Sequence, residues 1–542
     1  MSLPARSLER AELRAKVDEE IRQLAQLDDT IARLTKERTV LLAAIQAKEA
    51  LLSPIQLLPS DILGRIFVAC LPSTHNSVMS TIEAPLLLGR ICKTWRSLVY
   101  STPKLWASLH LVEPGLLPSI QPNRYAPVAV HPVPLAVTDA TKQAWAKRLR
   151  AAQIWLGRSA GCALSISVRI CTYEAMSALL PLLTFFANRW GSIEFLLHYP
   201  YVESPFLEQF GLEDFPALRS VVIVMLGPEG NPLDKTLRPW RGILSAKGLQ
   251  SLRMKAPTGS ESFALSDLPL SWKHLVYLRL DEPWELPLKD VVDLLRRCPV
   301  LRSLRAHLLQ AEPAADKETA LGGNPIDHGA LEDFCLHGYE RTPLPMMSLP
   351  RLKSLDVKGL LNIANSRRDT DALIASVQSS TVLTSIAIHT SIFPSRTQLL
   401  EFVSALPQSL RSFKAENALP VAAGWYGPTI PALPLIDDAL LSTFPTSFPA
   451  LRRLSLRGAT EISPTGLVRY IRDAQPALRE VRVRFRMQFV AGQDPSYFEA
   501  ELQDLIDEGL VVSVTSDYPT QGFPKAEMSP WWGVEEEREW EG

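Results

Sequence analysis

The pentapeptide Gly-Arg-Ser-Ala-Gly, residues 157–161, matches the G-x-S-x-G pattern that surrounds the nucleophilic serine of many hydrolases. In those enzymes a strand leads into the serine and a helix follows it, which exposes the hydroxyl for attack on a carbonyl carbon. Here the order is reversed, because the helical segment AKRLRAAQIWLG precedes Ser159 and the strand-like segment ALSISVRI follows it. The two glycines are better explained as a helix stop and a turn, so a hydrolase built around Ser159 is not expected.

The other residues with nucleophilic or metal-binding side chains match no recognised motif. None of the cysteines belongs to a C-x-x-C pair, and neither a glycine-rich nucleotide loop nor an H-E-x-x-H sequence occurs. We therefore expect no enzymatic activity, no cofactor and no metal. The six cysteines are Cys70, Cys92, Cys162, Cys171, Cys298 and Cys335.

Composition is that of a globular protein, with 46% hydrophobic and 21% charged residues among 542. This length exceeds one compact core unless the fold is an elongated repeat. The net charge of −1 gives no global attraction to nucleic acid or to an anionic membrane. The longest apolar run, around MSALLPLLTFFA, is too short to span a bilayer, and the N-terminus has no apolar signal-peptide core. We expect an intracellular protein, cytoplasmic or nuclear, without nucleic-acid or membrane partners.

Residues 1–53 predict a long amphipathic helix, since neither glycine nor proline occurs between Ala5 and Ser53. With Val17 as the first a position of a heptad, eight of the eleven a and d positions are apolar, which is typical of a coiled coil. Ile21 and Leu42 at e positions widen the apolar stripe, which favours packing on the same chain. Self-association through residues 7–52 and intramolecular packing therefore both stay open.

Residues 54–111 contain three apolar blocks, IQLLPSDILGRIF, LLLGRICKTWRSLV and TPKLWASLHL. The first two predict helices, and a loop of about residues 72–85 separates them. Helical spacing places Ile62, Leu63, Ile66 and Phe67 on one side of the first helix. Residues 112–140 are rich in proline and aperiodic, which indicates an irregular insert.

Residues 141–514 carry a short pattern, apolar-x-x-apolar-x-apolar, ten times. Its first leucines lie 21 to 41 residues apart, about 29 on average, and amphipathic helical stretches fill several of the gaps. This spacing predicts a leucine-rich-repeat solenoid in which each unit adds one strand to a parallel sheet and a helix covers the outer side. The acidic tail, residues 515–542, is expected to be disordered. The first leucines are Leu218, Leu249, Leu275, Leu301, Leu331, Leu352, Leu383, Leu410, Leu451 and Leu478.

The order of apolar groups in residues 54–111 resembles the F-box family, whose members open with Leu-Pro and an acidic residue. A short apolar helix, an Ile-Cys-x-x-Trp helix and a Leu-Trp pair follow in that family, and all of them have counterparts here. A leading heptad helix and trailing repeats are similar to F-box proteins of mushroom-forming fungi. The resemblance implies an α/β fold: a long helix, a small helical F-box-like module and a ribonuclease-inhibitor-like solenoid with a curved parallel sheet.

The resemblance also implies an interface with a Skp-type adaptor, which links F-box proteins to a cullin ubiquitin ligase. Trp95 and Trp106 are expected in the core of the F-box module, because large aromatic side chains usually anchor such cores. The residues expected at the adaptor interface are Leu57, Leu58, Pro59, Asp61, Ile62, Leu63, Ile66, Phe67, Ile91 and Cys92.

A target is expected to bind the open face of the predicted sheet. The fifth position of each repeat points to that face, and three consecutive repeats place an arginine there, at Arg253, Arg279 and Arg305. Three arginines in a column repel one another, which favours a binding site for an acidic or phosphorylated segment. The alternative is a solvated surface, because these repeats are rich in arginine in any case. The other residues expected on this face are Lys255, Tyr277 and His307.

The sequence thus predicts a substrate-recognition adaptor of an SCF-type (Skp-cullin-F-box) ubiquitin ligase, whose repeats bind an unidentified target. The alternative is a leucine-rich scaffold that oligomerises through its N-terminal helix without coupling to a ligase.

Overall fold

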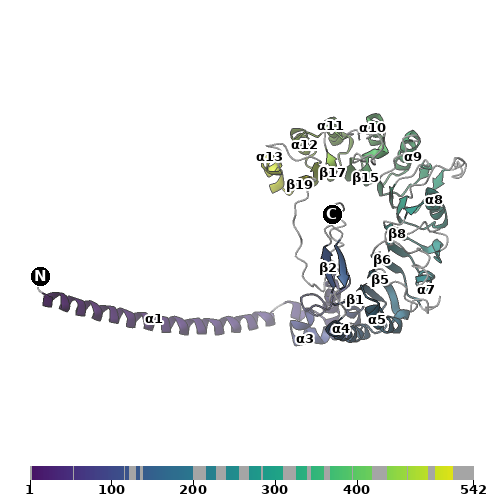
Figure 1. Ribbon diagram of the computed structural model, residues 1–542. Helices are drawn as coiled ribbons and strands as arrows, with labels where there is room; N and C mark the ends of the chain where they lie inside the picture. Colours follow the sequence, from purple (N-terminus) through teal and green to yellow (C-terminus); the bar gives the residue numbers. More distant parts are fainter. Residues whose placement is uncertain are drawn as a thin grey trace. The chain divides into compact units, whose positions relative to one another are not determined.

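The computed structural model (Figure 1) divides into two compact units. The first contains residues Met1–Leu71 and Leu87–Thr102, and the second contains Pro72–Leu86 and Pro103–Gly542. The structure describes residues 3–52, 54–114, 116–120, 130–134, 138–198, 215–226, 240–255, 268–281, 285–308, 325–338, 344–358, 366–393, 395–417, 436–459, 462–485 and 495–516. None of the helices within these ranges is long and apolar enough to cross a membrane.

The first unit is helical and begins with the predicted long helix, α1 (Leu3–Leu52). Every α1 side chain that the structure describes, from Arg14 to Lys48, is exposed, including those at the apolar a and d positions. The remaining elements are short. They are η1 (Pro54–Leu57), α2 (Ser60–Ala69), η2 (Leu88–Arg90) and α3 (Lys93–Ser101).

The second apolar block forms a 3-10 turn and a helix, where one continuous helix was expected. Cys92 lies between them in an extended conformation, and its Sγ accepts a hydrogen bond from the Trp95 backbone N–H at 3.4 Å. Cys92 therefore acts as the N-cap of α3 and satisfies one of the free N–H groups of its first turn.

The second unit is built on a parallel sheet of 15 strands, which confirms the α/β class and the predicted parallel sheet. Fourteen strands follow one another in chain order, so each unit of sequence adds one strand to the edge of the previous one. They are β1 (Ser108–Val112), β4 (Leu164–Ile170), β5 (Trp190–His198), β6 (Ser220–Leu226), β7 (Ser251–Lys255), β8 (Tyr277–Asp281), β10 (Ser303–Leu308), β12 (Asp333–Gly338), β14 (Ser354–Lys358), β15 (Ser385–His389), β16 (Ser412–Glu416), β17 (Arg453–Ala459), β18 (Glu480–Phe485) and β19 (Val511–Ser516).

All ten copies of the repeated pattern coincide with strands, from β6 to β18. In β7, for example, Leu252 and Met254 are buried while Ser251, Arg253 and Lys255 are partly exposed. This alternation places the fourth and sixth positions of the repeat in the core and the fifth and seventh positions on the opposite face of the sheet. Leu249, the first position of the same repeat, is also buried.

Helices of the second unit lie on the outer side of the curved sheet, and the strands line its inner side (Figure 1). In α8 (Leu288–Arg297) the buried residues Leu288, Val291, Val292 and Leu295 have the spacing of one helix face. The other α-helices are α4 (Asp139–Arg158), α5 (Tyr173–Phe185), α7 (Arg241–Leu244), α9 (Ser366–Gln378), α10 (Arg396–Ala405), α11 (Asp438–Ser447), α12 (Pro464–Asp473) and α13 (Pro495–Asp507).

Short elements complete this unit. The strands β9 (Glu285–Leu286), β11 (Ile326–Asp327) and β13 (Met347–Ser348) each have two residues. The 3-10 turns are η3 (Pro103–Trp106), η4 (Ala187–Arg189), η8 (Trp272–His274) and η10 (Thr390–Ile392).

The loop between the first two apolar blocks of residues 54–111 covers the edge of the sheet. Val78 is buried and forms a parallel bridge with His110 of β1, whose N–H donates to the Ser77 carbonyl at 2.8 Å. The Ser77 N–H in turn donates to Ser108 Oγ at 3.0 Å. An exposed edge strand would present unpaired backbone groups, so this loop caps the first strand of the repeat stack. The structure therefore divides residues 54–111 between the two units, unlike the single module that was expected.

The proline-rich insert contains an antiparallel pair of strands, β2 (Leu116–Ile120) and β3 (Val130–Pro134), where irregular chain was expected. The predicted disordered tail lies outside the described residues, apart from Thr515 and Ser516, which end β19.

Candidate functional site

The helical unit presents an apolar surface at its α2 helix. Leu58, Ile62 and Ile66 are 36%, 39% and 38% exposed, and the two isoleucines lie one helical turn apart. Leu87 and Ile91, from the second apolar block, are also exposed, at 43% and 56%. Isolated exposed apolar residues are common, but several in one small module are typical of a binding surface. We call these five residues the apolar surface of the helical unit.

Leu63 and Phe67 do not belong to this surface, although both were expected at the adaptor interface. They are 6% and 0% exposed, because they lie on the buried side of α2. The Phe67 ring packs against that of Trp95, with centroids 4.7 Å apart and planes tilted by 55°. Their prediction as interface residues was wrong, and they stabilise the module from within.

The remaining expected interface residues are exposed or only partly described. Pro59, Asp61 and Cys92 are exposed, and Cys92 also caps α3. Leu57 ends η1, and its side chain lies outside the described part of the chain.

The two tryptophans expected in the F-box core have different surroundings. Trp95 packs on Phe67 within the helical unit. Trp106 is fully buried in the second unit, where its ring meets that of Trp155 edge-on at 4.8 Å and the Arg158 guanidinium lies over it at 4.7 Å. Trp106 therefore anchors the start of the repeat stack, and its expected place in the F-box core was wrong.

The predicted arginine column exists in the sheet. Arg253, Arg279 and Arg305 occupy paired positions on the consecutive strands β7, β8 and β10. Adjacent strands lie about 4.8 Å apart, so three cations at this spacing would repel one another strongly without a counter-charge.

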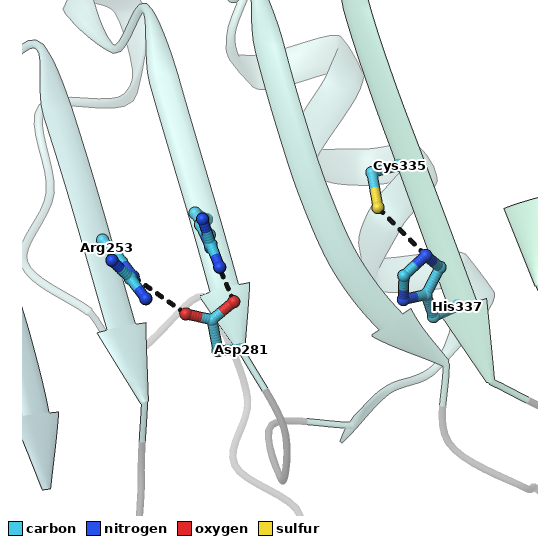
Figure 2. Close-up of polar contacts among 5 residues, drawn as sticks. Arg253, Asp281, Cys335 and His337 are labelled. Carbon is cyan, nitrogen blue, oxygen red and sulfur yellow. Dashed lines mark hydrogen bonds and ion pairs between the residues drawn. The ribbon is translucent and has the colours of Figure 1, made fainter. Parts of the chain in front are cut away.

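Asp281 supplies that counter-charge at the end of β8. Its Oδ2 lies 2.9 Å from Arg253 Nε (Figure 2), and its Oδ1 lies 2.7 Å from Arg279 Nε. Burial raises the pKa of Asp281, but hydrogen bonds and charge attraction from Arg279 and Arg253 outweigh this effect and hold the pKa below its usual value. One carboxylate thus bridges two arginines, so part of the column has a structural explanation.

The other residues expected on this face lie beside the column. Lys255 follows Arg253 on β7 and pairs in register with Asp281. Tyr277, at the start of β8, is 48% exposed, whereas His307 on β10 is buried. A net positive charge remains on β7 and β8, because Asp281 faces Arg253, Lys255 and Arg279.

A second polar cluster lies on the next strands of the same face. Cys335 and His337 come from β12, and Asp356 comes from β14. Cys335 Sγ lies 3.2 Å from His337 Nε2, which in turn lies 3.2 Å from Asp356 Oδ1 (Figure 2 shows the Cys335–His337 contact). Cys335 and Asp356 occupy the fifth positions of the repeats that begin at Leu331 and Leu352, but their contacts with His337 were not predicted, and neither was the role of Asp281. His337 and Asp281 could have been found from the seventh position of each repeat, because this position lies on the same sheet face as the fifth.

Ser159 lies between α4 and β4, as its flanking sequence indicated. Its hydroxyl donates to the Leu156 carbonyl and accepts from the Arg189 guanidinium, and the residue is completely buried. The first contact closes the end of α4, the second ties it to the turn before β5, and the element order is the opposite of a nucleophile elbow.

Neither a protein-family model nor a curated protein matches the chain, so its function is argued from the apolar surface of the helical unit and the polar face of the sheet.

Proposed function

We propose that the protein is the substrate-recognition adaptor of an SCF-type ubiquitin ligase, with an F-box that binds a Skp-type adaptor and leucine-rich repeats that bind a target. The observation that carries this proposal is the apolar surface of the helical unit. Ile62 and Ile66 are exposed on α2 and Leu58 is exposed just before it, whereas the adjacent stripe of the helix, with Leu63 and Phe67, is buried. An exposed apolar stripe beside a buried one is available for a partner.

The size of this surface sets the expected affinity. Full burial of a leucine or isoleucine is worth roughly 1.5–3 kcal/mol, so side chains that are 36% to 56% exposed gain roughly 0.5–1.5 kcal/mol each. The five residues together give roughly 3–6 kcal/mol, which is less than tight binding requires. Truncation of one residue to alanine should therefore weaken adaptor binding only severalfold, whereas a buried charge should abolish it.

Capture of the full chain from cells tests this proposal. The unmodified chain should co-purify with the Skp-type adaptor and a cullin, and the Leu58→Asp variant should lose both. Ile154→Asp is a matched control, because Ile154 is 59% exposed on α4, outside the helical unit. Absence of the adaptor from the unmodified capture would contradict the proposal.

The repeats are proposed to bind an acidic or phosphorylated segment of the target. The net positive charge on β7 and β8 supports this, because guanidinium groups make paired hydrogen bonds with carboxylates and phosphates. Asp281 already engages Arg253 and Arg279 through their Nε atoms. A guanidinium has five N–H donors, so the Nε contact of Arg279 with Asp281 leaves terminal donors of Arg279 that a ligand would use.

A scaffold that self-associates through α1 is the second candidate function. Its support is that the apolar a and d side chains of α1 are exposed, from 46% at Val17 to 60% at Leu27. A helix with such a stripe is rarely left uncovered in solution. Self-association and ligase coupling involve different surfaces, so the two are compatible.

A further inference from the structure

Cys335, His337 and Asp356 bring three different metal-binding groups to one point of the sheet. Cys335 and His337 lie two residues apart on β12, so their side chains share a face. Asp356 pairs with Cys335 in register on the neighbouring strand β14. The ligand atoms Sγ, Nε2 and Oδ1 all lie within 4.8 Å of one another.

These separations suit a tetrahedral metal ion. Zinc binds sulfur at about 2.3 Å and nitrogen or oxygen at about 2.0–2.2 Å, so its tetrahedral ligands lie about 3.4–3.6 Å apart. The Sγ–Nε2 and Nε2–Oδ1 distances are both 3.2 Å. The third pair, Sγ and Oδ1, lies within 4.8 Å, so a closing movement of up to about an ångström would bring all three groups to tetrahedral separations.

The polar contacts within this cluster are incomplete. His337 Nε2 approaches both Cys335 Sγ and Asp356 Oδ1, yet one ring nitrogen carries a single hydrogen or a single lone pair. Asp356 Oδ1 is buried, and the His337 Nε2 that lies 3.2 Å from it is the same nitrogen that approaches Cys335 Sγ. A cation between the three groups would let the thiolate, the imidazole and the carboxylate each use a lone pair.

We propose that Cys335, His337 and Asp356 form a binding site for a divalent transition-metal ion, with zinc as the preferred ion. A thiolate, an imidazole and a carboxylate are a set that zinc accepts, whereas magnesium and calcium favour oxygen ligands alone. Water or a donor from a bound partner completes the tetrahedron. The site is independent of the adaptor interface, because it lies on the sheet of the second unit.

Groups around the cluster support this role. The His307 ring packs edge-on against that of His337, with centroids 5.3 Å apart, and so orients the imidazole. Metal binding would displace the thiol proton, and the resulting thiolate and carboxylate charges would balance the dication. Arg305, which hydrogen-bonds to Cys335, would then support the bound sulfur from outside the coordination shell.

The test uses the reduced, metal-free full chain and titrates it first with Co²⁺ and then with Zn²⁺. Cobalt bound to a thiolate gives a sulfur-to-metal charge-transfer absorption in the near ultraviolet, and zinc should displace it. We expect one ion per chain. The Cys335→Ser variant should lose the charge-transfer band and bind zinc more than about 100-fold more weakly, because outer-shell partners alone are worth about 10–100-fold.

Two further variants and two controls keep the test independent of folding. Asp356→Asn preserves the shape of the side chain and should weaken zinc binding while leaving the thiolate band in place, and His337→Gln should weaken zinc binding as well. Cys162→Ser and His389→Gln change the same residue types outside the cluster and should bind zinc like the unmodified chain. Equal zinc affinity in Cys335→Ser and Cys162→Ser, with both variants folded by circular dichroism, would overturn the proposal. So would an unmodified chain that takes up no cobalt.

Discussion

Nε of Arg253 lies 2.9 Å from Oδ2 of Asp281, across two neighbouring strands of the sheet. The same carboxylate lies 2.7 Å from Arg279 Nε, so a single acidic residue holds two stacked cations together. The Asp281 side chain is only 13% exposed, whereas those of Arg253 and Arg279 are 27% and 35% exposed. The arginine column is therefore both a structural feature of the repeats and a surface that remains accessible to a ligand.

Replacement of Asp281 by asparagine should destabilise the second unit by about 1–2 kcal/mol at neutral pH, because the two arginines would repel each other without their shared carboxylate. The pKa of Asp281 is lowered in the folded protein, so its contribution is fully present above the ordinary carboxyl pKa and is lost as the pH falls through the lowered value. Urea denaturation at several pH values measures both effects. Asp293→Asn, which alters an exposed pair with Arg296 on α8, is the control and should change stability by less than about 0.5 kcal/mol.

Charge reversal of Arg279 and Arg305 together should abolish capture of the target by the repeats. Both side chains lie on the face expected to hold an acidic or phosphorylated segment, and the reversal would make this face repel it. Reversal of Arg296 and Arg297 on the outer helix α8 is the matched control. Proteins retained by the unmodified chain and by the control, but not by the Arg279/Arg305 variant, are the candidate targets. Identical retention by all three chains would contradict the proposed target face.

Asp369 makes the stability of the repeat stack pH-dependent. This residue of α9 is 4% exposed, its carboxylate accepts a hydrogen bond from the Leu344 N–H at 2.8 Å, and burial raises its pKa to about 6. Because the folded pKa is raised, the protonated side chain stabilises the fold below the ordinary pKa, and this stability is lost as the pH rises through about 6. The loss amounts to roughly 3 kcal/mol at full ionisation.

Asp369→Asn should therefore be more stable than the unmodified chain at about pH 8 and nearly equal to it at about pH 3, below the ordinary carboxyl pKa, because asparagine keeps the acceptor oxygen without the charge. Denaturation across this range measures the difference. Asp371→Asn, on the same helix and exposed beside Arg367, should show no such trend. A constant difference between Asp369→Asn and the unmodified chain would exclude the titration of Asp369 as its cause.

The α1 helix should mediate self-association of the full chain. Glutamate at two d positions, Leu27 and Leu34, would bury charges in a coiled-coil seam, so this variant should be monomeric. Glutamate at Ala25 and Ala32 has the same spacing at b positions, outside the seam, and should leave the assembly intact. Light scattering coupled to size exclusion gives the mass of each. A monomeric unmodified chain would remove the support for the scaffold function.

The strands of the repeat stack were predictable because their signal is local and redundant. Ten copies of the same apolar spacing cannot bury their faces one at a time, so the sequence pattern demands a stack. The role of residues 72–86 was not predictable, because Val78 reaches β1 through a single bridge that leaves no periodic signal.

The burial of α2 shows a second limit of prediction from the sequence. Ile62 and Ile66 form one stripe and Leu63 and Phe67 form the adjacent one, and all four are apolar. Which stripe is covered depends on where Trp95 lies, and this is decided by the packing of α3. Likewise, the contact of Asp281 with Arg253 joins two repeats, so no single repeat reveals it.

The most direct test of the proposed function is calorimetric titration of the purified full chain with a purified Skp-type adaptor. The unmodified chain should bind with one-to-one stoichiometry. The Ile62→Asp variant should show no binding, because a carboxylate would enter an apolar interface, and the Ile154→Asp control should bind like the unmodified chain. Unchanged binding by Ile62→Asp, or no binding by the unmodified chain, would contradict the proposal.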